Sequence, residues 1–337
     1  MSGVYALSEI YDLQMGKTPS RDNSKYWENG NYEWISIADL TKYGEYTGGS
    51  KEKITQKAIE ESGIRVIPSH TLIMSFKLSI GKVAITSRNC FSNEAIMAFI
   101  DKGVIKIIPE YAYYLFLAQD WDKGTNRAVM GATLNKATLS KYQVYIHDED
   151  IQKEIVYKLN KITNAIKYRK HQIEKIDELV KSQFIEMFGD PITNSQNRPT
   201  KLLVDVVKLQ RGYDLPVQDR IDGDIPVYGS NGVLSYHKDA KSEDGLITGR
   251  SGTIGKVYFC KGKFWPLNTT LYSVDKHENN PVFLTALLQY FDLSRFFNGT
   301  GVPTLNRNIV HKERIIDIPR EEQDQFARFV EQTDKSK

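Results

Sequence analysis

The sequence predicts a protein of the α+β class (loosely α/β), with two globular domains that are each followed by a long coiled-coil helix. Two observations carry this prediction. The same landmarks occur twice along the chain, and an apolar stripe with helical spacing, about 40 residues long, lies between the two copies. A chain of 337 residues is long enough for two domains with their own cores.

The repeat consists of short motifs that return in the same order. Residues 7–16 return as 203–212, shifted by 196 positions, and the Ile-Gly-Lys-Val at 80–83 returns at 254–257, shifted by 174. The Thr-Leu-Asn at 133–135 returns at 304–306, and Gln152 returns as Gln323, both shifted by 171. Because the offset between matching motifs falls from 196 to 171 along the chain, the first copy contains extra residues, mostly between Gly16 and Ile80. Two diverged copies predict two similar sites, and copies this long are not the units of a solenoid.

Each copy contains a predicted hairpin and a later helix. In the first copy the strands are expected at residues 72–75 and 83–86, and the helix at 111–119. In the second copy the strands are expected at 246–248 and 257–259, across a glycine-rich loop, and the helix at 281–291. Strands and helices that do not alternate regularly favour α+β domains.

The segment between the copies has the spacing of a coiled coil. Asp148 or Asp150 can cap its start, and Gly189 and Pro191 stop it, which gives a helix of roughly 60 Å. The apolar positions recur every three or four residues, except for a polar slot near Arg169 and Lys170. The expected interface residues are Ile155, Leu159, Ile162, Ile166, Ile173, Ile176, Val180 and Phe184.

A second helix is expected from Pro319, because Gln323, Phe326 and Val330 match Gln152, Ile155 and Leu159. The printed sequence ends after about five turns of that helix. The expected divisions are therefore a first domain at 1–147, the long helix at 148–190, a second domain at 191–318, and the start of the second helix at 319–337.

The composition is compatible with nucleic-acid binding but does not require it, since the formal net charge is +3. Cys90 and Cys260 do not occupy corresponding positions in the two copies, which argues against a disulfide framework. The first residues lack the pattern of a secretory signal, and the longest apolar run, at 111–118, is too short to cross a bilayer. We therefore expect a cytoplasmic protein.

The loops that precede the repeated Gly-Lys are candidate DNA-contact sites, because Arg and Lys contact phosphates or guanine edges. The alternative is a glycine-dependent turn with solvated charges. The loop at 249–257 is not a nucleotide phosphate loop, because five residues separate Gly249 from Gly255 and Val257 replaces the required hydroxyl residue. The candidates are Lys77, Ser79 and Lys82 in the first copy, and Arg250, Ser251, Thr253 and Lys256 in the second.

A second candidate set flanks the repeated Thr-Leu-Asn, where asparagine could pair with adenine. The alternative is turn chemistry, since Asn and Thr often bond their own backbone. This set comprises Arg127, Asn135, Lys136, Thr300, Asn306 and Arg307, and weaker candidates are Lys17, Thr18 and Arg21. A basic stretch on the long helix is either a contact surface or a solvated face, and contains Lys158, Lys161, Lys167, Arg169 and Lys170.

No catalytic pattern is recognisable. The six histidines form no pair at metal-ligand spacing, and no Ser–His–Asp arrangement, Asp-Pro-Pro-Tyr tetrapeptide or nuclease-type Pro-Asp with Glu-x-Lys is present in the sequence. The chain is therefore expected to be a binding subunit without catalytic residues, metal or cofactor.

Five segments, in this order, resemble the specificity (S) subunit of a type I restriction–modification enzyme. They are Trp-Ile-Ser-Ile-Ala-Asp-Leu at 34–40, Ser-Gln-Phe-Ile-Glu-Met-Phe-Gly-Asp-Pro at 182–191, Ile-Pro-Val-Tyr-Gly-Ser-Asn-Gly at 225–232, Gly-Arg-Ser-Gly-Thr-Ile-Gly-Lys-Val at 249–257, and Thr-Leu-Asn at 304–306. The resemblance covers almost the entire chain.

The resemblance implies that each globule is a target-recognition domain that reads one half of a split, asymmetric DNA sequence. It implies antiparallel helices that set the spacing and dock methyltransferase (M) subunits, with restriction (R) translocase–nuclease subunits completing the enzyme. S-adenosylmethionine, ATP and magnesium would then belong to the partner subunits. Two alternatives stay open: a structural protein–protein adaptor, and the detached recognition module of a fused methyltransferase–nuclease.

The second helix is too short to cover the whole apolar stripe of the long helix. Ile173, Ile176, Val180 and Phe184 should be covered from outside this copy of that helix. The candidates are a second copy of the chain, a methyltransferase subunit, or a separately encoded half-subunit.

Overall fold

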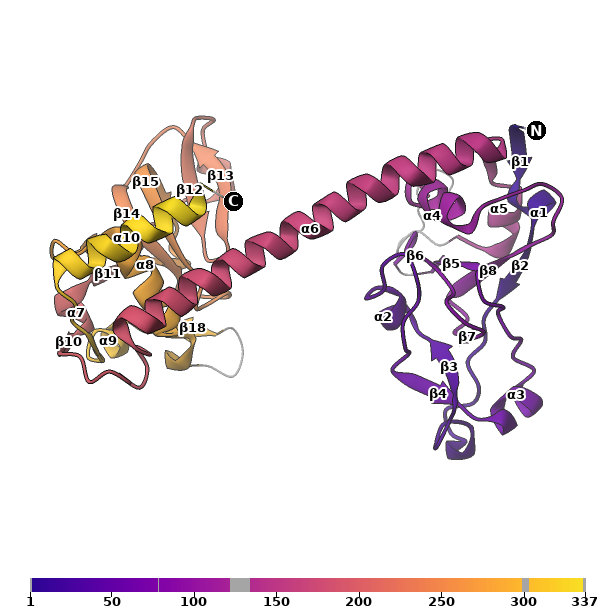
Figure 1. The fold of residues 1–337 in the computed structure, drawn as a ribbon, viewed down its shortest axis with the longest axis horizontal. Coiled ribbons are helices and arrows are strands. Elements are labelled where there is room, and N and C mark those ends of the chain that lie inside the picture. Colours follow the sequence, from indigo (N-terminus) through magenta and orange to yellow (C-terminus); the bar gives the residue numbers. More distant parts are fainter. Residues whose placement is uncertain (1, 78, 122–133, 299–302, 336–337) are drawn as a thin grey trace. The chain divides into compact units, whose positions relative to one another are not determined.

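The computed structural model describes residues 2–77, 79–121, 134–298 and 303–335. The chain forms two compact units, Met1–Ile166 and Lys167–Lys337. The boundary between them falls inside one helix, α6 (Glu149–Phe188), which begins in unit 1 and ends in unit 2 (Figure 1). Helices and strands are mixed in both units, which confirms the predicted fold class. The four-part division predicted from the sequence stays a prediction.

Unit 1 contains a four-stranded antiparallel sheet in the order β2-β8-β5-β6, a three-stranded sheet in the order β4-β3-β7, and the pair β1-β9. Its strands are β1 (Gly3–Ala6), β2 (Tyr11–Met15), β3 (Tyr32–Ile35), β4 (Glu52–Ile54), β5 (Leu72–Ser75), β6 (Val83–Ile85), β7 (Phe91–Ser92), β8 (Ile96–Asp101) and β9 (Gln143–Ile146). Its helices are α1 (Leu7–Ile10), α2 (Ile37–Leu40), α3 (Gln56–Ser62), α4 (Pro109–Leu117), α5 (Lys136–Lys141) and the first part of α6.

Unit 2 contains a six-stranded sheet in the order β11-β16-β14-β15-β12-β13, and the pairs β10-β19 and β17-β18. Its strands are β10 (Thr200–Leu202), β11 (Lys208–Arg211), β12 (Ile225–Gly229), β13 (Gly232–His237), β14 (Ser242–Gly249), β15 (Val257–Pro266), β16 (Thr270–Asp275), β17 (Phe297–Asn298), β18 (Thr304–Leu305) and β19 (Arg314–Ile316). Its helices are the end of α6, α7 (Leu203–Val206), α8 (Pro281–Tyr290), α9 (Arg307–Val310) and α10 (Arg320–Asp334).

The sequence repeat is also a repeat of the fold. The strand order β2-β8-β5-β6 of unit 1 matches β11-β16-β14-β15 of unit 2, and the terminal pair β1-β9 matches β10-β19. The predicted hairpins are β5-β6 and β14-β15, and the predicted helices are α4 and α8. Between β2 and β5 the first copy contains the helices α2 and α3 besides the strands β3 and β4, whereas the described stretch between β11 and β14 of the second copy contains β12 and β13 without an α-helix. The two helices contribute to the longer first copy.

A buried glutamine holds the same position in both copies. The side-chain amide of Gln152 donates hydrogen bonds to the carbonyls of Lys106 (2.8 Å) and His147 (2.7 Å), and its oxygen accepts from the Ile108 amide (2.9 Å). In unit 2 the oxygen of Gln323 accepts from the Asn280 amide (2.8 Å), and its nitrogen donates to the carbonyl of Ile318 (2.7 Å). Each glutamine thus ties the start of the last helix to the residue that caps α4 or α8.

The limits of α6 follow from local signals, as predicted. The Asp148 carboxylate accepts a hydrogen bond from the Ile151 amide (3.2 Å), which satisfies one of the free amides at the helix start. The helix ends before Gly189, which adopts a left-handed conformation (φ +80°) that favours glycine. Pro191 then follows.

The expectation that another chain, rather than this copy of the second helix, covers the end of the α6 stripe is wrong for Val180 and Phe184. Both are buried in unit 2. The ring of Phe184 lies 5.4 Å from that of Phe326 on α10 and 5.0 Å from that of Tyr290 on α8. The early turns of α10 therefore reach this part of the stripe, where Val180 and Phe184 join the core of unit 2.

The middle of the stripe remains accessible within the described chain. Ile162 and Ile166 are 56% and 52% exposed, and Ile173 is 36% exposed. Ile155 packs against the core of unit 1 instead. Whether a partner covers Ile162, Ile166 and Ile173 stays a prediction.

Candidate nucleic-acid interface

In unit 2 the structure brings together the two sets of candidate residues that the sequence places far apart. The loop between β14 and β15 pairs with β18, because the Leu305 amide donates to the Arg250 carbonyl (2.7 Å) and Ser251 lies opposite Thr304 in a β-bridge. Asn306 and Arg307 follow directly and are exposed. One surface of unit 2 therefore carries Arg250, Ser251 and the residues after the repeated Thr-Leu-Asn.

Arg250 is anchored at its inner end. Its backbone amide donates to the Thr269 carbonyl (2.8 Å), and its Nε donates to the Asn268 carbonyl (2.9 Å). Within residues 2–77, 79–121, 134–298 and 303–335, the terminal guanidinium nitrogens of Arg250 have no hydrogen-bond partner. A fixed guanidinium with free terminal donors suits a phosphate or a guanine edge.

The rest of this loop is shaped by backbone requirements. A Cβ atom on Gly249 would lie 1.7 Å from the Thr253 carbonyl oxygen, so only glycine fits there. Thr253 is half-buried, whereas Lys256 is exposed and its Nζ donates to the Asn231 side chain (3.0 Å). Lys256 therefore reaches across to the loop between β12 and β13.

The matching loop of unit 1 is held by a buried hydroxyl. The Ser75 hydroxyl donates to the Ser79 carbonyl and accepts from the Lys82 amide (3.1 Å). Ser79 and Lys82 are exposed, and the ammonium of Lys77 lies 5.3 Å from the ring of Phe76. The loop therefore presents Lys82 to solvent and keeps Lys77 against the protein.

The two repeated asparagines are helix caps. The Asn135 side chain accepts from the Thr138 amide (2.8 Å), and the Asn306 side chain accepts from the Asn308 amide (3.0 Å). An asparagine that pairs with adenine would use this same side-chain oxygen to accept a hydrogen bond from the base. The turn-chemistry alternative thus accounts for both asparagines. Arg127 and Thr300 lie outside the described residues.

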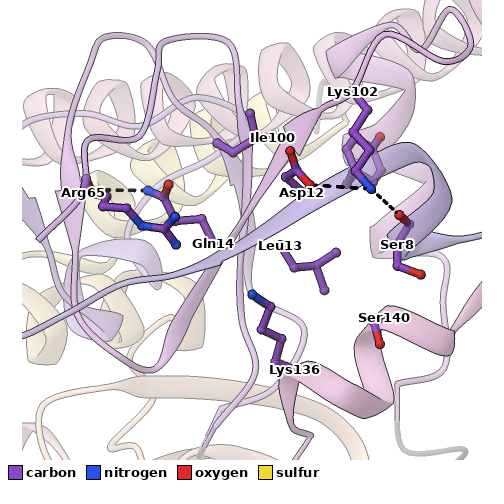
Figure 2. Close-up of a pocket in the computed structure, with 10 residues that line it drawn as sticks. Ser8, Asp12, Leu13, Gln14, Arg65, Ile100, Lys102, Lys136 and Ser140 are labelled. Atoms are coloured by element: carbon purple, nitrogen blue, oxygen red, sulfur yellow. Dashed lines mark hydrogen bonds and ion pairs between the residues drawn. The ribbon is translucent and has the colours of Figure 1, made fainter.

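Lys136 lies at a polar cavity of about 530 Å³ in unit 1, between β2, β8 and the start of α5 (Figure 2). Arg65 and Lys102 also line the cavity. Among the described residues that line it, Asp12 is the only acidic one. Of these three cations only Lys136 is predicted from the sequence, because tertiary folding brings the other two to it. The lining residues are Ser8, Tyr11, Asp12, Leu13, Gln14, Arg65, Ile100, Lys102, Lys136 and Ser140.

Unit 2 also gathers cations beside the corresponding strand, β11. The Leu209 amide of β11 donates to Nε2 of His311 (3.0 Å), so this nitrogen carries no proton. Burial and the nearby charges of Arg307 and Lys208 lower the pKa of His311. The His311 amide in turn donates to the Arg307 carbonyl (2.8 Å), so Arg307 and Lys208, the residue before Leu209, lie beside the same part of the strand.

The weaker candidates are mostly engaged within the protein. Arg21 forms an ion pair with Glu52 (2.5 Å) and lies over the ring of Trp27, 3.8 Å from its centroid. Thr18 donates a hydrogen bond to Glu94, and Lys17 is exposed. The basic stretch of α6, which contains Lys158, Lys161, Lys167, Arg169 and Lys170, is exposed along its length.

The described residues contain no group of three or more His, Cys, Asp or Glu side chains that could hold a metal ion. Over the same residues, no helix is both long enough and apolar enough to cross a membrane.

Comparison with known proteins places these units in a family. The family model described as "Type I restriction modification DNA specificity domain" matches residues 2–178 and 200–337. The chain is 25% identical over 284 residues to the EcoprrI type I restriction enzyme specificity subunit of Escherichia coli, over 77% of this chain and 69% of that relative. It is 27% identical over 237 residues to the MjaIX specificity subunit of Methanocaldococcus jannaschii, over 64% of this chain and 54% of that relative.

Solved structures show the same fold. The crystal structure of a type I restriction–modification S subunit from M. genitalium superposes with a TM-score of 0.60 at 14% identity, over all of this chain and 90% of that one. The two family matches together span most of the chain, with one in each copy of the repeat. The chain therefore belongs to the type I restriction–modification DNA specificity family.

Proposed function

We propose that the chain is the DNA-recognition subunit of a type I restriction–modification enzyme, in which each unit reads one half of a split, asymmetric DNA sequence. The observation that carries this proposal is the repeat of the fold within a family defined by DNA specificity. Two diverged copies of one reader supply two different half-sites. The chain itself contributes no catalytic residue in this proposal.

The loop candidates are the proposed DNA contacts. In unit 2 they are Arg250, Ser251, Thr253, Lys256 and Arg307, and in unit 1 they are Lys77, Ser79, Lys82 and Lys136. Arg250 is the strongest of them, because its anchored Nε orients the terminal nitrogens and limits the entropy lost on binding.

The proposed partners are double-stranded DNA, methyltransferase subunits and restriction subunits, as the resemblance to the family implies. S-adenosylmethionine, ATP and magnesium would be used by those partners. The exposed middle of α6, with Ile162, Ile166 and Ile173, is the proposed docking surface for a partner subunit.

Replacing Arg250 with alanine tests the reading role. If Arg250 reads a base, the variant loses about 1–3 kcal/mol of binding and relaxes one position of the second half-site. If Arg250 holds a phosphate, the variant binds all DNA sequences more weakly by the same factor. The slope of log affinity against log salt concentration then falls by about one. Unchanged affinity, selectivity and salt slope would remove Arg250 from the interface. Lys261→Ala, an exposed lysine elsewhere on unit 2, is the matched control.

A further inference from the structure

The cavity around Lys136 has a charge that the protein does not balance. Arg65, Lys102 and Lys136 reach it from three different parts of unit 1, against the single carboxylate of Asp12 (Figure 2). Like charges gathered in one cavity repel each other unless an anion lies between them. Three uncharged polar side chains, Ser8, Gln14 and Ser140, line the cavity beside the cations, which favours a polar ligand.

The three cationic side chains differ in the hydrogen bonds and ion pairs that they already form within the protein. Lys102 is engaged, because its Nζ donates to the Ser8 carbonyl (2.6 Å) and lies 3.5 Å from the Asp12 carboxylate. Arg65 and Lys136 are exposed and form no ion pair with any of the described residues. Figure 2 shows Lys136 extending from α5 toward the strand that carries Leu13, and Arg65 alongside Gln14. The two uncompensated charges therefore face one cavity.

The backbone that carries Arg65 is fixed to this strand. The side-chain nitrogen of Gln14 donates to the carbonyl of Val66 (2.9 Å) and to that of Arg65 itself (3.3 Å). These bonds tie the segment after α3 to the edge strand β2. The position of the cation at the cavity is thus part of the fold of unit 1.

The second copy repeats the feature with different residues. Arg307 occupies the position of Lys136 at the constant shift of 171, directly after the capping asparagine in each copy. Lys208 lies at the start of β11, the strand that matches β2. The next residue, Leu209, donates its amide to Nε2 of His311 (3.0 Å), and the His311 amide donates to the Arg307 carbonyl (2.8 Å), so both cations lie beside His311. A positive charge beside the edge strand and after the cap is therefore common to both units, although the sequences around it differ.

We propose that this surface seats a backbone phosphate of the bound DNA in each unit: at Arg65 and Lys136 in unit 1, and at Lys208 and Arg307 in unit 2. Lys and Arg side chains are donors only, so they match phosphate oxygens, and contacts of this kind position a protein without reading sequence. The proposal rests on the proposed function, because it assigns part of the same interface a positioning role. The loops that contain Arg250 and Lys82 then supply sequence selectivity.

The test measures DNA binding by the full chain as a function of salt concentration. The two probes are a duplex that carries the recognised sequence and a scrambled duplex of equal length. The variants are Arg65→Gln, Lys136→Gln and Arg307→Gln, and Lys42→Gln is the control, because Lys42 is exposed but does not line the cavity. Melting curves of each variant confirm that it is folded.

The expected result is that each variant weakens binding to both duplexes by the same factor and lowers the salt slope by about one. Lys42→Gln should change neither quantity. If all three variants keep the wild-type selectivity and the wild-type salt slope, the proposed phosphate contact is wrong. That result would not contradict the proposed function. A loss confined to the recognised duplex would also overturn the proposed phosphate contact, because that result indicates base reading. A wild-type chain that does not distinguish the two duplexes would overturn the proposed function itself.

A final arm separates DNA phosphate from free phosphate. Millimolar inorganic phosphate, at constant ionic strength, should not raise the melting temperature of the chain if the seat is built for a phosphodiester on DNA. A stabilisation that disappears in Lys136→Gln would instead assign the cavity to free phosphate and overturn the proposal.

Discussion

Replacing the buried glutamine of one copy should destabilise only the unit that contains it. In Gln152→Leu the side chain keeps a similar size but loses three hydrogen bonds, to Lys106, His147 and Ile108. At about 1 kcal/mol for each bond, the free energy of unfolding of unit 1 should fall by about 3 kcal/mol. Gln323→Leu should have a similar effect on unit 2, since Gln323 is also fully enclosed.

Equilibrium denaturation of the full chain can resolve the two units by tryptophan fluorescence. Of the four tryptophans, Trp27, Trp34 and Trp121 belong to unit 1 and Trp265 to unit 2. Single-tryptophan versions therefore report each unit separately. The matched control is Gln172→Leu, the same substitution at an exposed position of α6. An unchanged midpoint for unit 1 in Gln152→Leu, or an equal loss in both units, would refute the reasoning.

Three other predictions concern unit 2 and the stripe on α6. Because the pKa of His311 is lowered in the folded unit, the unfolded chain takes up its proton at a higher pH, so unit 2 should lose stability as the pH falls below about 6.5. His311→Gln should weaken that acid dependence, and identical melting curves of the two proteins from pH 8 to pH 5 would contradict the assignment. Phe326→Ala should cost unit 2 about 3–5 kcal/mol, because the ring is buried against Phe184, and an unaltered unfolding midpoint would exclude that packing. Ile162→Asp should leave the melting of the isolated chain unchanged, since Ile162 is 56% exposed, but prevent co-purification with the methyltransferase subunits. Normal assembly of that variant, with Lys161→Asp as the control, would mean that the stripe is not a docking surface.

Local signals made much of the fold predictable from the sequence. The capping aspartate and the Gly189–Pro191 stop placed α6, and the repeated motifs identified the matching hairpins and helices. The repeat also paired Gln152 with Gln323, although their shared role depends on carbonyls that the fold brings to them. What could be predicted was therefore set by neighbouring residues or by the repeat.

The rest of the site depends on tertiary packing. Nothing near Lys136 in the sequence indicates that Arg65 and Lys102 line the same cavity, because β2-β8 pairing and the segment after α3 bring them there. The covering of Val180 and Phe184 by α8 and α10 was missed for a similar reason. A periodic apolar stripe predicts burial but does not identify the surface that buries each residue.

The central claim is that two separable readers on one chain recognise two halves of one DNA sequence. The most direct test is to express the chain with its methyltransferase subunits and map adenine methylation across a genome, before and after residues 1–147 are exchanged for the corresponding globule of a relative. We predict a split motif with an unread spacer, of which only one half changes on exchange. A continuous motif, or a change in both halves at once, would contradict the account.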